Sequence, residues 1–216
     1  MAAVVDLCNR SLSLLGAGSI ASLTEASTEA VACRRWWDSV RQQVLRAAFW
    51  NSTRRLAELN LRSEELGQWT YTYTYPPDCL HARFIDATDG KFPPFVVASV
   101  EVTGGVDKVI LTNAESAKLW YTADSEDPSE WDPLLEQAIV DALAGNMAVE
   151  LTGKRSYRVD LFQKANSTIM SARSAAALEM RLDPSWKPGK LEAMDDWTDL
   201  SYDASPFVVP DGPLFV

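Results

Sequence analysis

The sequence predicts an α+β, mainly α fold, with a four-helix core, an antiparallel β insertion and an extended C-terminal arm. In four segments apolar residues recur every three or four positions, which is the period of amphipathic helices. Between the second and third of these segments the period changes to two, which is typical of strands. We therefore expect a helical domain from residues 1–66 and 124–182, a β insertion from 67–123, and an arm from 183–216.

The first two helices are predicted from their apolar stripes. One runs from Val4 to Leu15 and is ended by Gly16-Ala17-Gly18, since glycine readily adopts left-handed backbone. The other runs from Ala26 to Leu56, and we expect one long helix there, around which the rest of the chain is organised. Trp50 is expected to close the core near its C-terminal end, and Arg54-Arg55 to lie where the helix dipole favours positive charge.

The β insertion begins with a strongly alternating segment. Aromatic residues at Trp69, Tyr71, Tyr73 and Tyr75 alternate with threonines, which places all the rings on one face of a strand. Pro76-Pro77-Asp78 ends it. Further strands are predicted at Phe95 to Val102, Asp107 to Leu111 and Lys118 to Thr122, with a hairpin turn at Thr103-Gly104-Gly105.

The last two helices have recognisable ends. Asp132-Pro133 predicts an N-cap followed by proline in the first turn of a third helix, whose stripe runs from Leu135 to Leu151 and stops at Gly153. A fourth helix is predicted from Tyr157 to Leu182, and Asp183-Pro184 ends it.

The remaining segment, residues 183–216, has no convincing period. It contains several aromatic residues among prolines and acids, and from Glu192 to Val216 there are six acids and no Lys or Arg. Such a segment cannot fold alone, yet it has too many aromatic residues for a purely solvated tail. We predict an arm that docks on a neighbouring subunit or a partner. Its candidate contact residues are Trp186, Trp197, Tyr202, Phe207 and Phe215.

Composition excludes several classes of protein. The longest uncharged apolar runs, such as Phe92 to Val100, are too short to cross a bilayer, and the N-terminus lacks the features of a secretory signal, so we expect the protein to stay where it is made. The three cysteines, Cys8, Cys33 and Cys79, are widely spaced, and we expect apolar filling residues in a reducing cytoplasm. The net charge of −10 disfavours nucleic-acid binding by the whole surface.

Charge is nevertheless unevenly distributed. Seven arginines against Asp38 and Glu58 give the segment from Arg34 to Arg62 a net charge of 7 − 2 = +5. Arg34, Arg35 and Arg41 could contact DNA phosphates, but a solvated face or an inter-subunit salt-bridge surface fits the acidic chain better. The Trp/Tyr strand could likewise stack on single-stranded nucleic acid, although without interleaved basic residues core packing is favoured.

No catalytic, cofactor or metal site is predicted. His81 is the single histidine, with Asp78, Cys79 and Asp86 near it, and we expect it in a loop that follows a strand. A metal site or a histidine-dependent triad needs further ligands or an orienting partner. There is no nucleophile elbow and no phosphate-binding loop, and Gly16-Ala17-Gly18 follows a helical pattern where a dinucleotide site needs a strand. We therefore expect a protein that is not an enzyme.

Several segments taken together resemble the tail tubular protein A family of short-tailed bacteriophages. The likeness depends on the order and spacing of the pieces, and it covers roughly Leu12 to Thr152. In chain order the pieces are Leu12 to Leu23, Ser27, Glu29-Ala30, Trp36-Trp37-Asp38, Leu45, Phe49-Trp50-Asn51, Arg54 to Ala57, Trp69 to Tyr75, Pro77-Asp78-Cys79-Leu80, Leu119-Trp120-Tyr121, Trp131-Asp132-Pro133-Leu134, Leu143-Ala144, Ala148 and Leu151-Thr152.

The resemblance implies a head-to-tail adaptor in the neck of a virion, assembled in the host cytoplasm. It implies a helical bundle with a β insertion, arranged as a twelve-fold ring of identical copies beneath the portal protein. A downstream tail or nozzle protein would be the next partner, and genomic DNA would pass through the central channel without specific binding and without any membrane. It implies no catalytic residue and no cofactor.

Two other functions remain open from the sequence. One is a DNA-binding packaging or regulatory factor that uses the basic face between Arg34 and Arg62, for which salt-sensitive affinity is expected. The other is an accessory enzyme such as a cell-wall hydrolase, which needs a pair of carboxylates that the sequence does not reveal.

Overall fold

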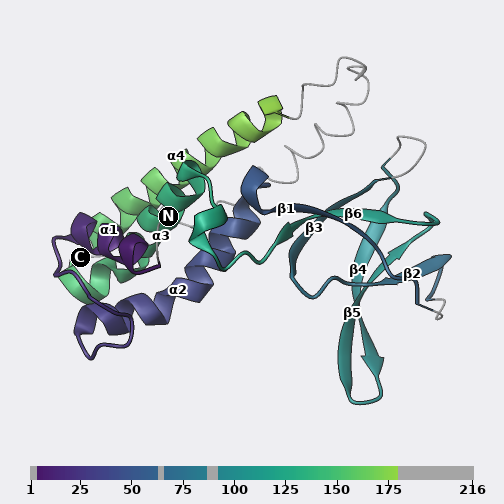
Figure 1. The fold of residues 1–216 in the computed structure, drawn as a ribbon, viewed down its shortest axis with the longest axis horizontal. Helices are drawn as coiled ribbons and strands as arrows, with labels where there is room; N and C mark the ends of the chain where they lie inside the picture. The colour runs from purple at the N-terminus through teal and green to yellow at the C-terminus, as the bar shows by residue number, and fades with distance from the viewer. Residues whose placement is uncertain (1–3, 63–65, 87–91, 180–216) are drawn as a thin grey trace, which may run out of the picture. The chain divides into compact units, whose positions relative to one another are not determined.

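The computed structural model describes residues 4–62, 66–86 and 92–179 (Figure 1). This part of the chain divides into two compact units. The described residues up to Asn51 and from Asp127 onward form the first unit, which is helical. Those from Ser52 to Glu126 form the second unit, which contains the six strands.

The helical unit is built around a central helix that packs against the three others. Its helices are α1 (Val4–Leu15), α2 (Thr28–Ala47), α3 (Pro133–Thr152) and α4 (Arg155–Glu179). α3 is the central one, and buried residues lie on all of its faces, among them Leu135, Ile139 and Leu143. A helix that is apolar all round must be surrounded by other elements, and α1, α2 and α4 supply that cover.

The predicted helix ends at α3 are confirmed. Asp132 caps α3, because its Oδ1 accepts hydrogen bonds at 2.9 Å from the backbone N–H groups of Leu134 and Leu135. Gly153 ends the helix with a φ of +69°, and its N–H donates to the Val149 carbonyl. Since α4 begins two residues later, α3 and α4 form an αα-hairpin of neighbouring helices (Figure 1).

The long helix predicted to reach Leu56 is shorter, because α2 ends at Ala47. Ala48 is extended, and the Arg173 guanidinium of α4 donates two hydrogen bonds to the Ala47 carbonyl, which the helix leaves unpaired. Trp50 is buried as predicted, with its Nε1 donating to the Val44 carbonyl at 2.9 Å. The next residues leave the helical path, so the prediction that Arg54-Arg55 lie at a helix C-terminus is wrong.

The described residues of the second unit form six strands in two antiparallel three-stranded sheets (Figure 1). The strand order is β1-β6-β3 in one sheet and β2-β5-β4 in the other. The strands are β1 (Arg54–Glu58), β2 (Tyr71–Thr74), β3 (Cys79–Asp86), β4 (Phe95–Val102), β5 (Gly105–Thr112) and β6 (Lys118–Ala123). The predicted strands at β2, β4, β5 and β6 are confirmed, with β4 at its predicted bounds, whereas β1 and β3 were not predicted.

Side chains from both sheets meet in one core. Tyr73 and Ile110 come from the second sheet, and Ile85, Leu119 and Tyr121 come from the first. Tyr73 is buried, and its hydroxyl donates to the Ala114 carbonyl at 2.9 Å. The aromatic face of the alternating segment therefore packs into protein, as favoured over a stacking platform for nucleic acid.

The fold class predicted from the sequence, a mainly α protein on a four-helix core, is wrong. The part of the chain that the structure describes has a mixed α/β fold, with four helices and two three-stranded antiparallel sheets. The two sheets are no minor insertion, because they have a hydrophobic core of their own.

Candidate interaction surfaces

The three arginines proposed as contacts on α2 do not present one common face. Arg34 is exposed, and its Nη1 donates to the Leu23 carbonyl at 2.7 Å. Arg35 is exposed and forms an ion pair with Glu150 of α3 at 2.7 Å. Arg41, although one heptad after Arg34, is only 2% exposed. Of these three arginines, Arg34 and Arg35 therefore remain at the surface of α2, and each already has a protein partner.

The remaining arginines of the basic segment divide between the two units. Arg46 is exposed on α2, whereas Arg54 and Arg55 lie in β1 of the second unit. Arg62 also belongs to the second unit, and its Nη1 lies 3.0 Å from the Asp107 carboxylate. The run of positive charge seen in the sequence is therefore divided among a helix, a strand and a loop.

The predicted contact residues of the arm lie outside the described residues. These are Trp186, Trp197, Tyr202, Phe207 and Phe215. Their role therefore stays a prediction.

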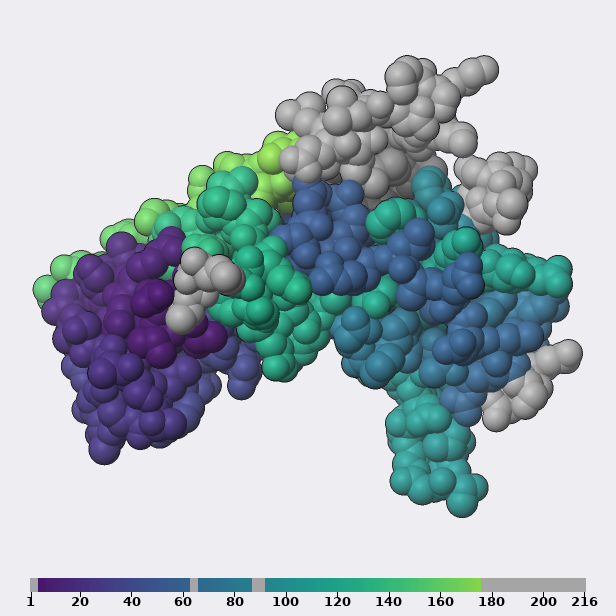
Figure 2. All heavy atoms as spheres, in the orientation of Figure 1, coloured from purple at the N-terminus to yellow at the C-terminus, as the bar shows by residue number. Residues whose placement is uncertain are grey.

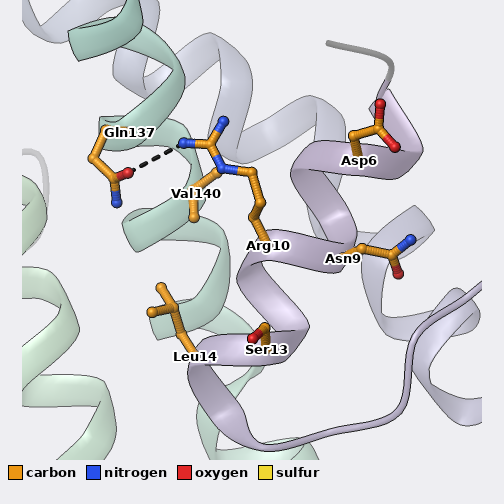
Figure 3. Close-up of a pocket in the computed structure, with 7 residues that line it drawn as sticks. All are labelled: Asp6, Asn9, Arg10, Ser13, Leu14, Gln137 and Val140. Carbon is orange, nitrogen blue, oxygen red and sulfur yellow. Dashed lines mark hydrogen bonds between the residues drawn. The ribbon is translucent and has the colours of Figure 1, made fainter.

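A groove of about 540 Å³ runs between α1 and α3 in the helical unit (Figure 3). From α1, Arg10 points across it towards α3, where its Nη2 donates to the Gln137 Oε1 at 3.1 Å (Figure 3). Its Nη1 also pairs with Glu136 at 2.8 Å. The guanidinium therefore bridges two helices. Leu14, which is 42% exposed, is the apolar residue at the rim.

Below this groove a charged residue lies inside the helical core. Asp141 of α3 is fully buried, and its Oδ1 accepts hydrogen bonds at 2.9 Å from Gln137 Nε2 and from Lys164 Nζ of α4. Burial of a carboxylate is costly unless a cation and hydrogen bonds offset it; both are present at Oδ1, whereas the buried Oδ2 accepts no hydrogen bond from the described residues. Sequence reasoning missed this pair, although an acid between Val140 and Ala142 in an apolar helix was a visible signal.

A second groove, of about 320 Å³, lies where α3 begins and α4 approaches its end. Exposed residues at its mouth are Asn51, Pro133, Leu134 and Ala175, with Leu134 39% exposed. The buried Trp50 forms part of its wall. We call this the α3/α4 groove, and sequence periodicity could not reveal it because its walls come from three separate segments.

The β4–β5 hairpin stands out from the rest of the second unit (Figure 2). β2 pairs with β5 only from Val109 to Thr112, so the outer half of the hairpin is a two-stranded ribbon. Val106 near its tip is 65% exposed. Two-stranded ribbons are marginally stable in water, so this exposed apolar tip is a candidate contact surface.

The cysteines are free and buried, as predicted for filling residues. A hydrogen bond with the Cys33 thiol and burial both raise the pKa of Cys8, while the same hydrogen bond lowers the pKa of Cys33. His81 lies within β3, opposite Thr122 of β6, so its predicted loop position is wrong.

Neither a metal site nor a membrane span is found in the part of the chain that the structure describes. No group of three or more His, Cys, Asp or Glu side chains there is arranged to hold a metal ion. No described helix combines the length and the hydropathy that crossing a bilayer requires.

Several pieces that carry the family resemblance meet in space. Trp37 stacks on Trp131, with ring centroids 6.2 Å apart and planes inclined by 21°. In the second unit the Tyr121 hydroxyl donates to the Asp78 carboxylate at 3.1 to 3.2 Å. Comparison with models of known protein families gives no match, and no curated protein is significantly similar to the chain.

Proposed function

We propose that this protein is a structural adaptor of a bacteriophage virion, which docks under the portal ring and presents a surface for the next tail component. Copies of the chain would form a ring of twelve-fold symmetry, through which genomic DNA passes without specific binding. The residue pattern that resembles the tail tubular protein A family motivates this function.

The observation that carries the proposal is the pairing of the resemblance pieces within the fold. Trp36-Trp37-Asp38 and Trp131-Asp132-Pro133-Leu134 are far apart in sequence, yet Trp37 and Trp131 stack. Phe49-Trp50-Asn51 and the Trp131 piece also supply walls of the same groove. The pieces therefore lie at contacts between elements that are far apart in the sequence, which supports a role for them in the framework of the fold.

The same holds in the second unit. Pro77-Asp78-Cys79-Leu80 and Leu119-Trp120-Tyr121 meet through the Tyr121 hydroxyl and the Asp78 carboxylate. Cys79 also pairs with Ala123 at the end of β6. Tyr121, Asp78 and Cys79 thus join neighbouring elements, which suits a protein whose role is to hold a shape.

The charge pattern suits a ring of identical copies. A rotational repeat joins two unlike surfaces head to tail, so one side of the subunit must complement the other. Arg34 and Arg35 are exposed on α2, and the segment from Glu192 to Val216 carries six acids without Lys or Arg. An acidic chain also keeps the phosphate-binding contribution small, which a DNA conduit requires. We infer that the aromatic arm, with Trp186, Trp197 and Phe207, grips the portal or the adjacent subunit.

The proposal is tested by sedimentation of the full chain mixed with the portal protein encoded in the same genome. We expect a complex that gains about a dozen copies of this chain, since a closed ring has one copy for each portal subunit. The chain alone is the reference, because an adaptor can stay monomeric until its template is present. If the portal gains no mass, the adaptor function is contradicted.

A DNA-binding packaging or regulatory factor is the competing function. Charge reversal of Arg34 and Arg35 would then remove a salt-sensitive affinity for DNA. The adaptor proposal expects no such affinity, so a DNA titration at two salt concentrations separates the two functions. Burial of Arg41 removes one of the three phosphate contacts on which the DNA-binding function was based.

A further inference from the structure

The α3/α4 groove lies close to the point where the described chain ends. Ala172 and Ala175 of α4 line it, and α4 is described to Glu179. At a rise of 1.5 Å per residue, Ala172 lies about 10 Å along the helix from Glu179. The mouth of the groove is therefore within reach of the residues that follow α4.

We propose that this groove is the docking site for Trp186 of the same chain. Trp186 lies seven positions after Glu179, and seven residues span at most roughly 23 to 25 Å. This reach exceeds the distance back to Ala172. Pro184 stops a helix from continuing through this segment, because proline lacks the amide hydrogen and clashes with the preceding turn. The residues after Glu179 are therefore long enough to reach the groove, and Pro184 lets the chain leave the helical direction and turn back towards it.

The walls of the groove suit an indole ring. Pro133, Leu134 and the two alanines supply apolar surface, and Trp50 supplies an aromatic wall. A tryptophan side chain buries about 150 to 250 Å² and needs a polar partner only at its N–H. Asn51 and Asp132 at the same groove provide polar oxygen atoms of that kind.

Charge complements this apolar fit. Asp132 is the charged residue among those that line the groove. On the other side, Trp186 is followed by Lys187 and Lys190, and no acid lies between Asp183 and Glu192. The groove therefore favours the segment around Trp186 over the segment around Trp197.

Position in sequence also favours Trp186 over the other aromatic residues of the arm. The entropic cost of closing a loop grows with its length, so the first aromatic residue after α4 closes the shortest loop. Docking of Trp186 would fix the direction in which the rest of the arm leaves the helical unit, and it would leave the grip on the portal or the adjacent subunit to Trp197 and Phe207. This inference does not depend on the adaptor function, since it concerns one chain alone.

Fluorine NMR of the full chain labelled with 5-fluorotryptophan tests the inference. The Trp186 resonance is assigned by its absence in Trp186→Phe, and its solvent isotope shift reports exposure. We expect a buried Trp186 in the wild type, and exposure of Trp186 in Leu134→Gln. Leu14→Gln is the matched control, because Leu14 is similarly exposed but lies in the groove between α1 and α3.

Each outcome decides the inference. A Trp186 resonance that is solvent-exposed in the wild type, or that responds equally to Leu14→Gln and Leu134→Gln, overturns it. Burial that is lost on dilution of the sample would identify the occupant as a second copy and would also overturn it. Ala175→Gln is a second groove variant on another helix, which guards against a fold defect specific to Leu134→Gln. Cooperative thermal unfolding of both variants confirms that they are folded.

Discussion

Asp141 shows how one charged residue can specify a helix pair. It lies on the side of α3 that faces α4, where Lys164 reaches its carboxylate at 2.9 Å. Although Lys164 is half-exposed, Asp141 is fully buried, so the lysine is the charge that makes the burial tolerable. An apolar residue at position 141 could not pair with Lys164.

The Lys164→Met variant should therefore lose stability. The stem of the side chain is kept, but the buried carboxylate loses its cation, so we expect the free energy of unfolding to fall by about 2 to 3 kcal/mol. Urea denaturation measures it. Arg35→Met is the matched control, because the Arg35–Glu150 pair is exposed and should contribute less than about 1 kcal/mol. Equal losses in the two variants would contradict a special role for the buried pair.

Tyr121 should make the stability of the protein fall at high pH. Burial, and then the nearby Asp78 carboxylate, raise the pKa of Tyr121 to about 12, from an ordinary value near 10. The folded state therefore holds its proton more tightly than the unfolded state does. Its contribution is complete below pH 10 and is lost as the pH rises towards 12, by at most about 2 to 3 kcal/mol.

The comparison of wild type with Tyr121→Phe isolates this effect. Phenylalanine keeps the ring in the core but has no proton to lose. The stability difference between the two proteins, measured by denaturation between pH 9 and pH 12, should shrink or reverse as the pH rises. A difference that does not change over that range would show that Tyr121 titrates normally.

At the scale of the element, the contact between α3 and α4 depends on a glycine. A Cβ added at Gly145 would lie 2.6 Å from Cε1 of Phe162 on α4, which is far inside van der Waals contact. Phe162 is buried, and the Arg158 guanidinium lies 5.3 Å from its ring centroid. The ring has little room to move, so glycine here permits the close approach of the two helices.

Gly145→Ala should therefore destabilise the protein, although alanine is the better helix former by up to about 1 kcal/mol. We expect a net loss of about 1 to 3 kcal/mol from overpacking. Phe162→Leu combined with Gly145→Ala should lose less than the sum of the two single changes, because the smaller side chain makes room. Denaturation of the three variants gives the coupling. A stabilising Gly145→Ala would show that the helices separate freely.

The elements that the sequence predicted well are those with local signals. Asp132 and Gly153 mark α3 by their own capping chemistry, and β4 follows a clear apolar run that ends at a glycine turn. The end of α2 and the strand β1 had no local signal. Arg54-Arg55-Leu56 continues a helical stripe by chance, and only pairing with β6 makes it a strand.

The candidate contacts show the same limit. Periodicity places Arg41 on the face of Arg34, but tertiary packing buries it, and no single-helix pattern contains that information. β3 was missed for a related reason: register shifts break its alternation, so Cys79 to Asp86 does not have a strand period. The walls of the α3/α4 groove come from segments far apart in the chain, and only the fold brings them together.

At the scale of the whole molecule, the second unit should fold by itself. Its buried cluster, with Tyr73, Ile85, Ile110 and Leu119 among its members, consists of residues between Ser52 and Glu126. A protein of residues 52–126 should show dispersed amide resonances and one cooperative thermal transition. Ile110→Ala in that protein is the control, since it removes buried apolar volume and should lower the transition temperature. Non-cooperative melting would mean that this unit depends on the helical one.

Removal of the arm should abolish assembly on the portal without preventing the chain from folding. A protein that ends at Leu182 keeps the described contacts among α1, α2, α3 and α4, so we expect it to unfold cooperatively, at a midpoint lowered only by the loss of Trp186 from the α3/α4 groove. It should nevertheless fail to add mass to the portal in sedimentation, because the proposed grip by Trp197 and Phe207 is gone. The full chain with both residues changed to alanine keeps the length of the arm and should fail likewise.

If the truncated protein still loads about a dozen copies onto the portal, the grip lies in the folded units, and the exposed β4–β5 hairpin becomes the surface to change next.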